Sequence, residues 1–309
     1  MNKDLIDLTE LAPSELIALL DLADDIKKNP FKYRDAMDRK TLLMIFEKPS
    51  LRTRVSFETG MTQMGGHGIY YHLGTSPMGK KETVADTAKT ASRYVDIIMA
   101  RLFSNAQMRD LAAHSSVPVI NGLDDVAHPC QILCDLQTIR EKKGRLAGLK
   151  LCYVGDSNNN VTHSLLIGCA LAGVNIRVGC PKGEEFEPKA DIAEKARALA
   201  KASGSSVTIT HDAKEAARDA DIIYTDSWMS YHIEDTEKKR RVNTLMPYQV
   251  NTALSAHAKK DHLFMNCLPA ERGAEQTADV IDGPHSIVFD QAENRLHAQK
   301  ALIITLLRN

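Results

Sequence analysis

The sequence predicts an α/β protein built from two doubly wound, parallel-sheet domains. Short apolar, β-rich runs alternate with amphipathic segments of helical period along the whole chain. Such alternation is typical of an open parallel sheet with helices on both faces. The alternation comes in two series, the second of which begins at Lys150. A length of 309 residues is enough for two domains of ordinary size.

The first series opens with a helix predicted at residues 14–27, where Pro13 stands in the first turn. Strands are then predicted at 42–46, 68–71, 97–100 and 117–121, and helices at 52–64, 83–93 and 108–114. In the second series we expect strands at 150–154, 175–178, 206–210, 222–225, 263–266 and 286–289, with helices at 162–172, 192–203 and 213–218. One helix at 129–143, ending at Gly144, is predicted to bridge the two domains.

Bulk properties exclude several classes of protein. A net charge of −1 and a pI near 6.8 give no electrostatic argument for binding nucleic acid or membranes. The longest basic cluster, residues 238–241, is flanked by acidic residues and is interpreted as a solvated helix face. Six cysteines scattered through apolar runs indicate reduced, buried thiols. Without a signal peptide or a long apolar run, the protein is expected to be cytoplasmic.

Residues 50–54, Ser-Leu-Arg-Thr-Arg, carry the strongest local signal for function. They follow a predicted buried strand and start a predicted helix. The N-terminus of a helix offers free N–H groups and the positive end of the helix dipole, which together bind anions. Arginine adds permanently charged, forked donors that suit phosphate oxygens. The alternative is a capping serine followed by two solvated arginines.

Two other interpretations are weighed against this one. Residues 153–160 follow a strand and precede a helix, as in a nucleotide-binding dehydrogenase, but they contain one glycine where the motif requires three. Cys130 and Cys134, with His128 nearby, have the spacing of metal ligands, but no second Cys/His pair follows. We therefore expect no metal and no cofactor.

Further motifs follow in a fixed order. They are Arg101 after the strand predicted at 95–100, His128-Pro-Cys-Gln131, Asp226-Ser-Trp-Met-Ser230, Asn266-Cys-Leu-Pro269 and Glu293-Asn-Arg295. In this order the chain resembles the aspartate/ornithine carbamoyltransferase family, and its ornithine branch most. The resemblance covers nearly all of the chain, with motifs in five separate segments.

The resemblance implies two domains joined by interdomain helices, with the active site in the cleft between them. Residues 1–143 would bind carbamoyl phosphate, and the last helix, 291–309, would return to that domain. Residues 144–290 would bind the amine. The implied reaction transfers the carbamoyl group of carbamoyl phosphate to the side-chain amine of L-ornithine, giving L-citrulline and phosphate in arginine metabolism.

The resemblance also implies roles for individual residues. Carbamoyl phosphate would be bound by Ser50, Leu51 (through its backbone N–H), Arg52, Thr53, Arg101, His128, Gln131 and Arg295. Ornithine would be bound by Asn160, Asp226, Ser230, Tyr231, Cys267 and Leu268. The catalytic residues among these would be Arg101, His128, Asp226 and Cys267. A homotrimer, or a multiple of one, is expected, in which Ser76, Lys80 and Lys81 reach the site of a neighbouring subunit.

Four positions depart from the pattern of the ornithine branch. Leu51 replaces a threonine, Asn266 replaces a histidine, Tyr231-His232 replace Met-Gly, and Pro77 stands where a glutamine is usual. The loop at 75–82 is instead similar to that of the aspartate branch. The sequence therefore leaves open another amine, such as putrescine, aspartate or a modified ornithine. It also leaves open a silent homologue that only binds a ligand.

Overall fold

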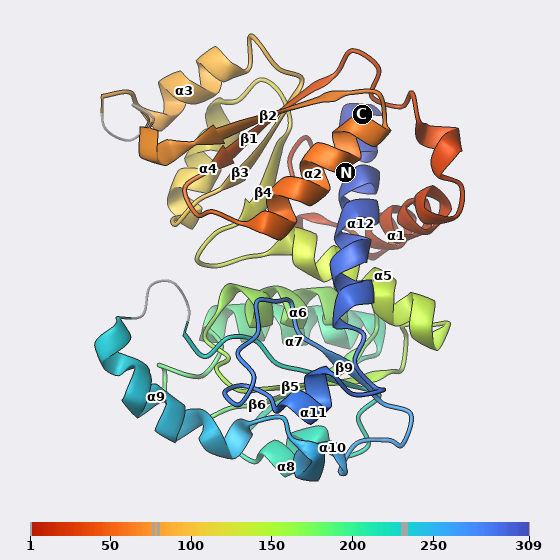
Figure 1. The fold of residues 1–309 in the computed structure, drawn as a ribbon, viewed down its shortest axis with the longest axis vertical. Helices are drawn as coiled ribbons and strands as arrows, with labels where there is room; N and C mark the ends of the chain where they lie inside the picture. The colour runs from red at the N-terminus through yellow and green to blue at the C-terminus, as the bar shows by residue number, and fades with distance from the viewer. Residues whose placement is uncertain (1, 76–77, 79–80, 230–233, 309) are drawn as a thin grey trace. The chain divides into compact units, whose positions relative to one another are not determined.

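The structure is a computed structural model that describes residues 2–75, 78, 81–229 and 234–308. The chain divides into two compact units (Figure 1). Unit 1 comprises Met1–Gln137 and Glu293–Asn309, and unit 2 comprises Thr138–Ala292. Each unit contains one parallel sheet, which confirms the predicted fold class. Among the described residues, no helix combines the length and the apolar character needed to span a bilayer.

The sheet of unit 1 has the strand order β2–β1–β3–β4, and every neighbouring pair is parallel. Its strands are β1 (Thr41–Phe46), β2 (His67–His72), β3 (Ile97–Arg101) and β4 (Val119–Leu123). The helices assigned wholly or partly to this unit are α1 (Pro13–Lys28), α2 (Leu51–Gln63), α3 (Val84–Ala91), α4 (Asn105–His114), α5 (Pro129–Lys143) and α12 (Val288–Arg308). Figure 1 shows α3 and α4 on one side of this sheet and α2 on the other.

The apolar run of β1 explains this layering. Ile45 belongs to the buried cluster formed with α3 and α4, whereas Leu42, Met44 and Phe46 are fully buried at the alternate positions. Side chains at alternate positions of a strand point to opposite faces of the sheet. A strand that is apolar at both sets of positions therefore needs helices on both sides, as parallel sheets have.

The sheet of unit 2 has the order β7–β6–β5–β8–β9 and is also parallel throughout. Its strands are β5 (Lys150–Val154), β6 (Asn175–Gly179), β7 (Val207–Thr210), β8 (Ile222–Tyr224) and β9 (Leu263–Met265). Its helices are α6 (Asn160–Leu171), α7 (Ala190–Ser203), α8 (Ala213–Ala217), α9 (Lys238–Leu245), α10 (Thr252–Ser255) and α11 (Ala278–Ile281). Figure 1 shows α6 and α7 on one face of this sheet and α8, α10 and α11 on the other.

The strand predicted at residues 286–289 is wrong. Ser286 forms a single parallel bridge with Phe264, and α12 begins two residues later at Val288. Of the three apolar residues in this run, Ile287 and Val288 are buried, whereas Phe289 is 72% exposed. The pairing ends after one bridge because the chain enters a helix.

Both sheets have a switch point at which the strand order reverses. In unit 1 the chain moves from β1 to β2 on one side and then to β3 on the other, and in unit 2 it moves from β5 to β6 and later to β8. Ligands of open parallel sheets bind beside the carboxyl ends of the strands at such points. The segments after β1 and β3 and those after β5 and β8 are therefore the places to look for a site.

Candidate functional site

In unit 1 the candidate site starts at the N-terminus of α2, directly after β1. Ser50 has an extended backbone, and its Oγ accepts a hydrogen bond from the Thr53 N–H at 3.3 Å. This cap satisfies one of the free N–H groups of the first turn and leaves others for an anion. The Leu51 side chain is 76% exposed, so its contribution to an anion site is its backbone N–H.

Thr53 is the point at which four segments of unit 1 meet. Its fully buried Oγ1 accepts a hydrogen bond from Arg295 Nη2 at 3.1 Å and lies 3.5 Å from Arg101 Nη1. Arg295 Nη1 donates to Gln131 Oε1 at 2.7 Å. Residues far apart in the sequence, on α2, β3, α5 and α12, thus form one buried polar cluster.

Arg295 is a buried residue rather than a surface partner of Glu293, which stands two positions before it. Arg295 is only 2% exposed. Glu293 instead lies 3.5 Å from Lys27 and 3.7 Å from His297. A buried guanidinium held by neutral oxygens keeps its positive charge available for an anionic ligand.

His128 lies directly before α5 and is buried. Burial lowers its pKa well below the usual 6.5, and the positive charges of Arg295, Arg101, Arg52 and Lys48 act in the same direction. The imidazole is therefore neutral at pH 7. A neutral imidazole donates from one ring nitrogen and accepts at the other, so it can hydrogen-bond a carbonyl oxygen without giving up a proton.

Lys48 is a site residue that the sequence analysis missed. It is buried, its Nζ lies 4.5 Å from the centre of the Phe103 ring, and burial followed by the charge of Arg101 lowers its pKa. The available signal was its place between a buried strand and the capping serine. With Arg52, Arg101 and Arg295 it gives this end of the sheet a concentration of positive charge suited to a phosphate group.

In unit 2 the strand register brings Asp226 and Cys267 together. Tyr224 on β8 pairs with Met265 on β9, and each of the two site residues follows two positions later. The Cys267 thiol donates to Asp226 Oδ1 at 3.0 Å. A sulfur that donates its proton to a carboxylate is a thiol, whereas a covalent nucleophile must be a thiolate.

Asn266, one of the four departures, has a structural role beside Cys267. It is fully buried, its Oδ1 accepts from the Leu268 N–H at 2.8 Å, and its Nδ2 donates to Gln276 Oε1 at 3.0 Å. Leu268 has φ +58°, a left-handed conformation that leucine rarely adopts. The asparagine therefore holds the strained turn that follows Cys267.

Asn160, another predicted site residue, is the first residue of α6. Its neighbour Asn159 caps the helix by accepting from the Thr162 N–H at 2.8 Å and donates to the Tyr153 hydroxyl at 3.1 Å. Burial raises the pKa of Tyr153 well above 10, and the charge of Asp226 adds to that shift. Asp226 is thus within electrostatic reach of the strand end that precedes α6.

Glu275 is a second carboxylate within the electrostatic reach of Asp226. Burial raises its pKa to about 7, the charge of Asp226 contributes, and its Oε1 accepts from the Glu271 N–H at 2.8 Å. Its place near Asp226 could not be predicted from the sequence, because the residues around Glu275 form no recognisable motif. Carboxylates in proximity make this part of unit 2 suited to a cation.

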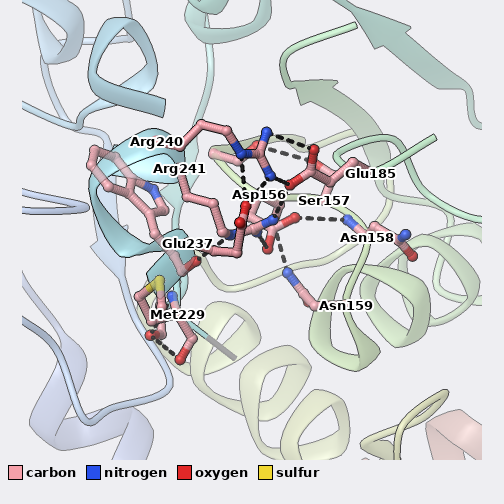
Figure 2. A network of polar contacts seen from close by, with 12 residues as sticks. Asp156, Ser157, Asn158, Asn159, Glu185, Met229, Glu237, Arg240 and Arg241 are labelled. Carbon is pink, nitrogen blue, oxygen red and sulfur yellow. Dashed lines mark hydrogen bonds and ion pairs between the residues drawn. The ribbon is translucent and has the colours of Figure 1, made fainter. Parts of the chain in front are cut away.

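Figure 2 shows a further polar network in unit 2, centred on Arg241 of α9. Arg241 is 3% exposed; it donates to Asp156 at 2.5 Å, to Glu185 at 2.8 Å and to the Trp228 carbonyl at 3.2 Å. The prediction that residues 238–241 form a solvated face is therefore wrong at Arg241. Trp228 lies two residues from Asp226, so this network anchors the segment that carries Asp226.

Some predicted residues cannot be placed. Ser76, Lys80, Ser230 and Tyr231 lie outside the described residues, as do Pro77 and His232, and the described Lys81 is exposed. Cys130 and Cys134 are buried thiols that are not joined in a disulfide. Within the described ranges no three His, Cys, Asp or Glu side chains group as metal ligands.

Glu275 leads to a prediction for pH dependence. Its folded-state pKa of about 7 lies above the ordinary 4.5, so the folded protein binds more protons than the unfolded one between these values. The free energy of unfolding should then fall as the pH rises from about 4.5 to 7, by up to about 3 kcal/mol. Glu275→Gln should remove this decline and raise stability at pH 8. Urea midpoints at pH 5 and 8, followed by the fluorescence of the single tryptophan, Trp228, measure it; equal pH slopes in both proteins would contradict it.

Comparison with known proteins identifies the family. Residues 3–141 match the model of the aspartate/ornithine carbamoyltransferase carbamoyl-P binding domain, and residues 147–306 match that of the Asp/Orn binding domain. The chain is 51% identical to the ornithine carbamoyltransferase of Bacillus subtilis over 306 residues, 99% of this chain and 94% of that protein. It is 50% identical to that of Thermococcus kodakarensis, covering 99% of this chain and 96% of that protein.

Two solved structures agree with these matches. The ornithine carbamoyltransferase of Pyrococcus furiosus has a TM-score of 0.93 at 48% identity, covering 97% of this chain and 95% of that one. The ornithine transcarbamoylase of Giardia lamblia has a TM-score of 0.91 at 45% identity, covering 99% and 98%. This chain therefore belongs to the aspartate/ornithine carbamoyltransferase family.

Proposed function

We propose that this protein transfers the carbamoyl group of carbamoyl phosphate to the side-chain amine of L-ornithine, giving L-citrulline and phosphate. The observation that carries the proposal is the buried cluster of Thr53, Arg101, Gln131 and Arg295 next to a neutral His128. The similar proteins described above are ornithine carbamoyltransferases, which agrees with it. The residue roles that follow are part of the same proposal.

The proposed carbamoyl phosphate site lies in the domain predicted as residues 1–143 with 291–309. Its phosphate would be held by Ser50, Arg52, Thr53 and the free N–H groups of α2, including that of Leu51. Arg101 and His128 would donate to the carbonyl oxygen as it becomes anionic. Arg295 would hold the phosphate and the carbonyl group in position relative to each other. One preorganised donor of this kind typically contributes about 3–4 kcal/mol to lowering the barrier.

The proposed amine site lies in residues 144–290. Asp226 would orient the amine, the Cys267-Leu268 turn would contact its reacting end, and Asn160 would contact the α-amino-acid end. Ser230 and Tyr231 are proposed for that end as well. The carboxylates Asp226 and Glu275 favour a cationic substrate over a second anion such as aspartate.

The reaction needs the amine without its proton. Removing a proton from a lysine-like amine at pH 7 costs about 4–5 kcal/mol. The free amine nitrogen then attacks the carbonyl carbon, the new C–N bond forms, and the C–O bond to phosphate breaks. The electron pair of the broken C–O bond leaves with the phosphate. The phosphate is also a suitable acceptor for the one proton that the attacking nitrogen must lose; the other stays on the nitrogen in citrulline. No cofactor and no covalent enzyme intermediate is required.

We also propose a homotrimer, or a multiple of one, for the assembly. Leu51 and Val55 on α2 are exposed apolar residues, and Ile69 is a third on the edge strand β2. Exposed apolar side chains and an open sheet edge are features that association covers. Ser76, Lys80 and Lys81 would then serve the neighbouring subunit's site. The six cysteines are all reduced thiols outside any disulfide, which supports a cytoplasmic location, and citrulline formation supports a role in arginine biosynthesis.

A substrate panel tests the proposal. We expect kcat/KM with carbamoyl phosphate to be highest for ornithine among ornithine, lysine, putrescine, aspartate and N-acylated ornithines. Lysine, one methylene longer, should lose about 1–3 kcal/mol in transition-state binding. If another amine had a higher kcat/KM, that amine would replace ornithine as the proposed acceptor, and the proposed carbamoyl phosphate site would be unaffected. Carbamoyl phosphate binding without transfer to any amine would favour the silent homologue.

A further inference from the structure

The side-chain amide of Gln131 forms hydrogen bonds with two charged residues, one through its NH₂ group and the other through its oxygen. Its Nε2 donates to Asp135 Oδ1 at 2.9 Å, and its Oε1 accepts from Arg295 Nη1 at 2.7 Å. An amide oxygen can only accept hydrogen bonds and an amide NH₂ can only donate them. The orientation of this side chain therefore depends on both partners.

Asp135 is suited to fix that orientation. It lies four residues after Gln131 on α5, so both side chains are on one face of the helix, and it is fully buried. A carboxylate accepts hydrogen bonds but does not donate them, so Asp135 can bind only the NH₂ end of the Gln131 amide and not its oxygen. Reversing the amide would place oxygen against carboxylate and NH₂ against guanidinium, and both hydrogen bonds to charged groups would be lost.

The fixed orientation has a chemical consequence for the ligand. An amide oxygen has two lone pairs, and Arg295 uses one of them. The other can accept an N–H from the carbamoyl group, which carries NH₂ where an acetyl group carries CH₃. A buried acceptor left unpaired by the methyl group would disfavour that ligand.

We propose that Asp135 is a positioning residue that keeps the Gln131 oxygen turned toward the anion site and so makes the site select a carbamoyl group over an isosteric acyl group. The inference rests on the proposed function, because it needs the ligand to bind at the Thr53–Arg295 cluster. Asp135 does not touch the ligand and acts through Gln131.

Two stable phosphonates test this selectivity by calorimetry. Phosphonoacetamide carries the amide NH₂, and 2-oxopropylphosphonate carries a methyl group in its place. The wild-type protein should prefer phosphonoacetamide by about tenfold or more. Asp135→Asn can offer Gln131 either an amide oxygen or an NH₂, so only Arg295 still favours the observed orientation of the Gln131 amide. The preference should then fall to about threefold or less, while the affinity for inorganic phosphate should change by less than about twofold.

Kinetics and a double mutant separate positioning from a merely structural role. For Asp135→Asn, the KM for carbamoyl phosphate should rise about tenfold while that for ornithine stays within about twofold. In a Gln131→Ala background the same substitution should add nothing further, because its route to the ligand is already removed. Independent, additive effects would overturn the inference.

Asp124→Asn is the matched control. Asp124 is also fully buried in unit 1 and accepts from Asn105 and Asn121, so this change removes a buried charge away from Gln131. It should leave the preference between the two phosphonates intact. If Asp135→Asn does not fold, Asp135→Ala is judged by the same preference. A wild-type protein without any preference would count against the proposed function itself. An undiminished preference in the Asp135 variant would overturn only the role of Asp135.

Discussion

Replacing Arg101 by alanine should lower kcat by about 10²–10³-fold with a smaller change in the KM for carbamoyl phosphate. Arg101 ends β3 at the switch point, is buried, and lies 3.5 Å from Thr53. Its charge would act most strongly on the carbonyl oxygen as that atom becomes anionic, so the loss falls on the transition state more than on the bound substrate. Steady-state kinetics with saturating ornithine measures it.

Arg109→Ala is the control for Arg101→Ala. Arg109 is an exposed arginine of the same unit, on α4, whose Nη1 lies 3.6 Å from Glu10. Its removal should leave kcat unchanged. Arg101→Ala with near-normal turnover would remove Arg101 from the catalytic assignment. Inactivity accompanied by loss of the wild-type circular dichroism spectrum would show damage to the fold instead, and Arg101→Lys would then decide whether the forked guanidinium is needed.

Replacing Arg241 by methionine should destabilise unit 2 by about 3–5 kcal/mol, because it leaves a buried carboxylate without its counter-charge. Asp156 is buried, and burial raises its pKa while Arg241 opposes that rise. The same change frees the Trp228 carbonyl, so the KM for the amine should rise more than that for carbamoyl phosphate. Urea denaturation followed by Trp228 fluorescence gives the stability.

The neighbouring Arg240 provides the matched control. It lies on the same helix and pairs with Glu185 and Glu237, but it is half-exposed (Figure 2). Exposed ion pairs contribute little to stability, so Arg240→Ala should leave the denaturation midpoint unchanged. The double variant Asp156→Asn/Arg241→Met should recover part of the loss, since neither partner is left charged and alone. Equal destabilisation by Arg240→Ala and Arg241→Met would refute the distinction between them.

The strands and helices could largely be predicted because their residues satisfy local rules. The run from Thr41 to Phe46 is apolar on both faces, and Ser50 is a good capping residue at the point where a helix must start. The error at 286–289 has a local cause as well: Phe289 is apolar but exposed. A run of three apolar residues does not reveal whether the chain will pair as a strand there or enter a helix.

The candidate site divides in the same way. Residues in motifs, such as Arg101 and Asp226, could be named from the sequence because the resemblance covers them. Lys48, Asp135 and Glu275 could not, since their roles depend on which distant side chains surround them. The proposed role of Asp135 depends on the hydrogen bond between Gln131 and Arg295, two residues that are 164 positions apart in the sequence. The prediction for Arg241 was wrong for the same reason. The basic run at 238–241 has the same sequence pattern whether its last arginine is solvated or pairs with a buried aspartate.

Unit 1 is made of two stretches of chain, Met1–Gln137 and Glu293–Asn309, whereas unit 2 is a single stretch. Protein synthesis proceeds from the N-terminus, and domains fold as units while they emerge. All of unit 2 is therefore synthesised before the second stretch of unit 1. Arg295 belongs to that second stretch, so a nascent chain that already holds Thr53 and Gln131 still lacks the guanidinium that hydrogen-bonds both of them. The buried polar cluster therefore forms only after Arg295 has been synthesised, later than every segment of unit 2.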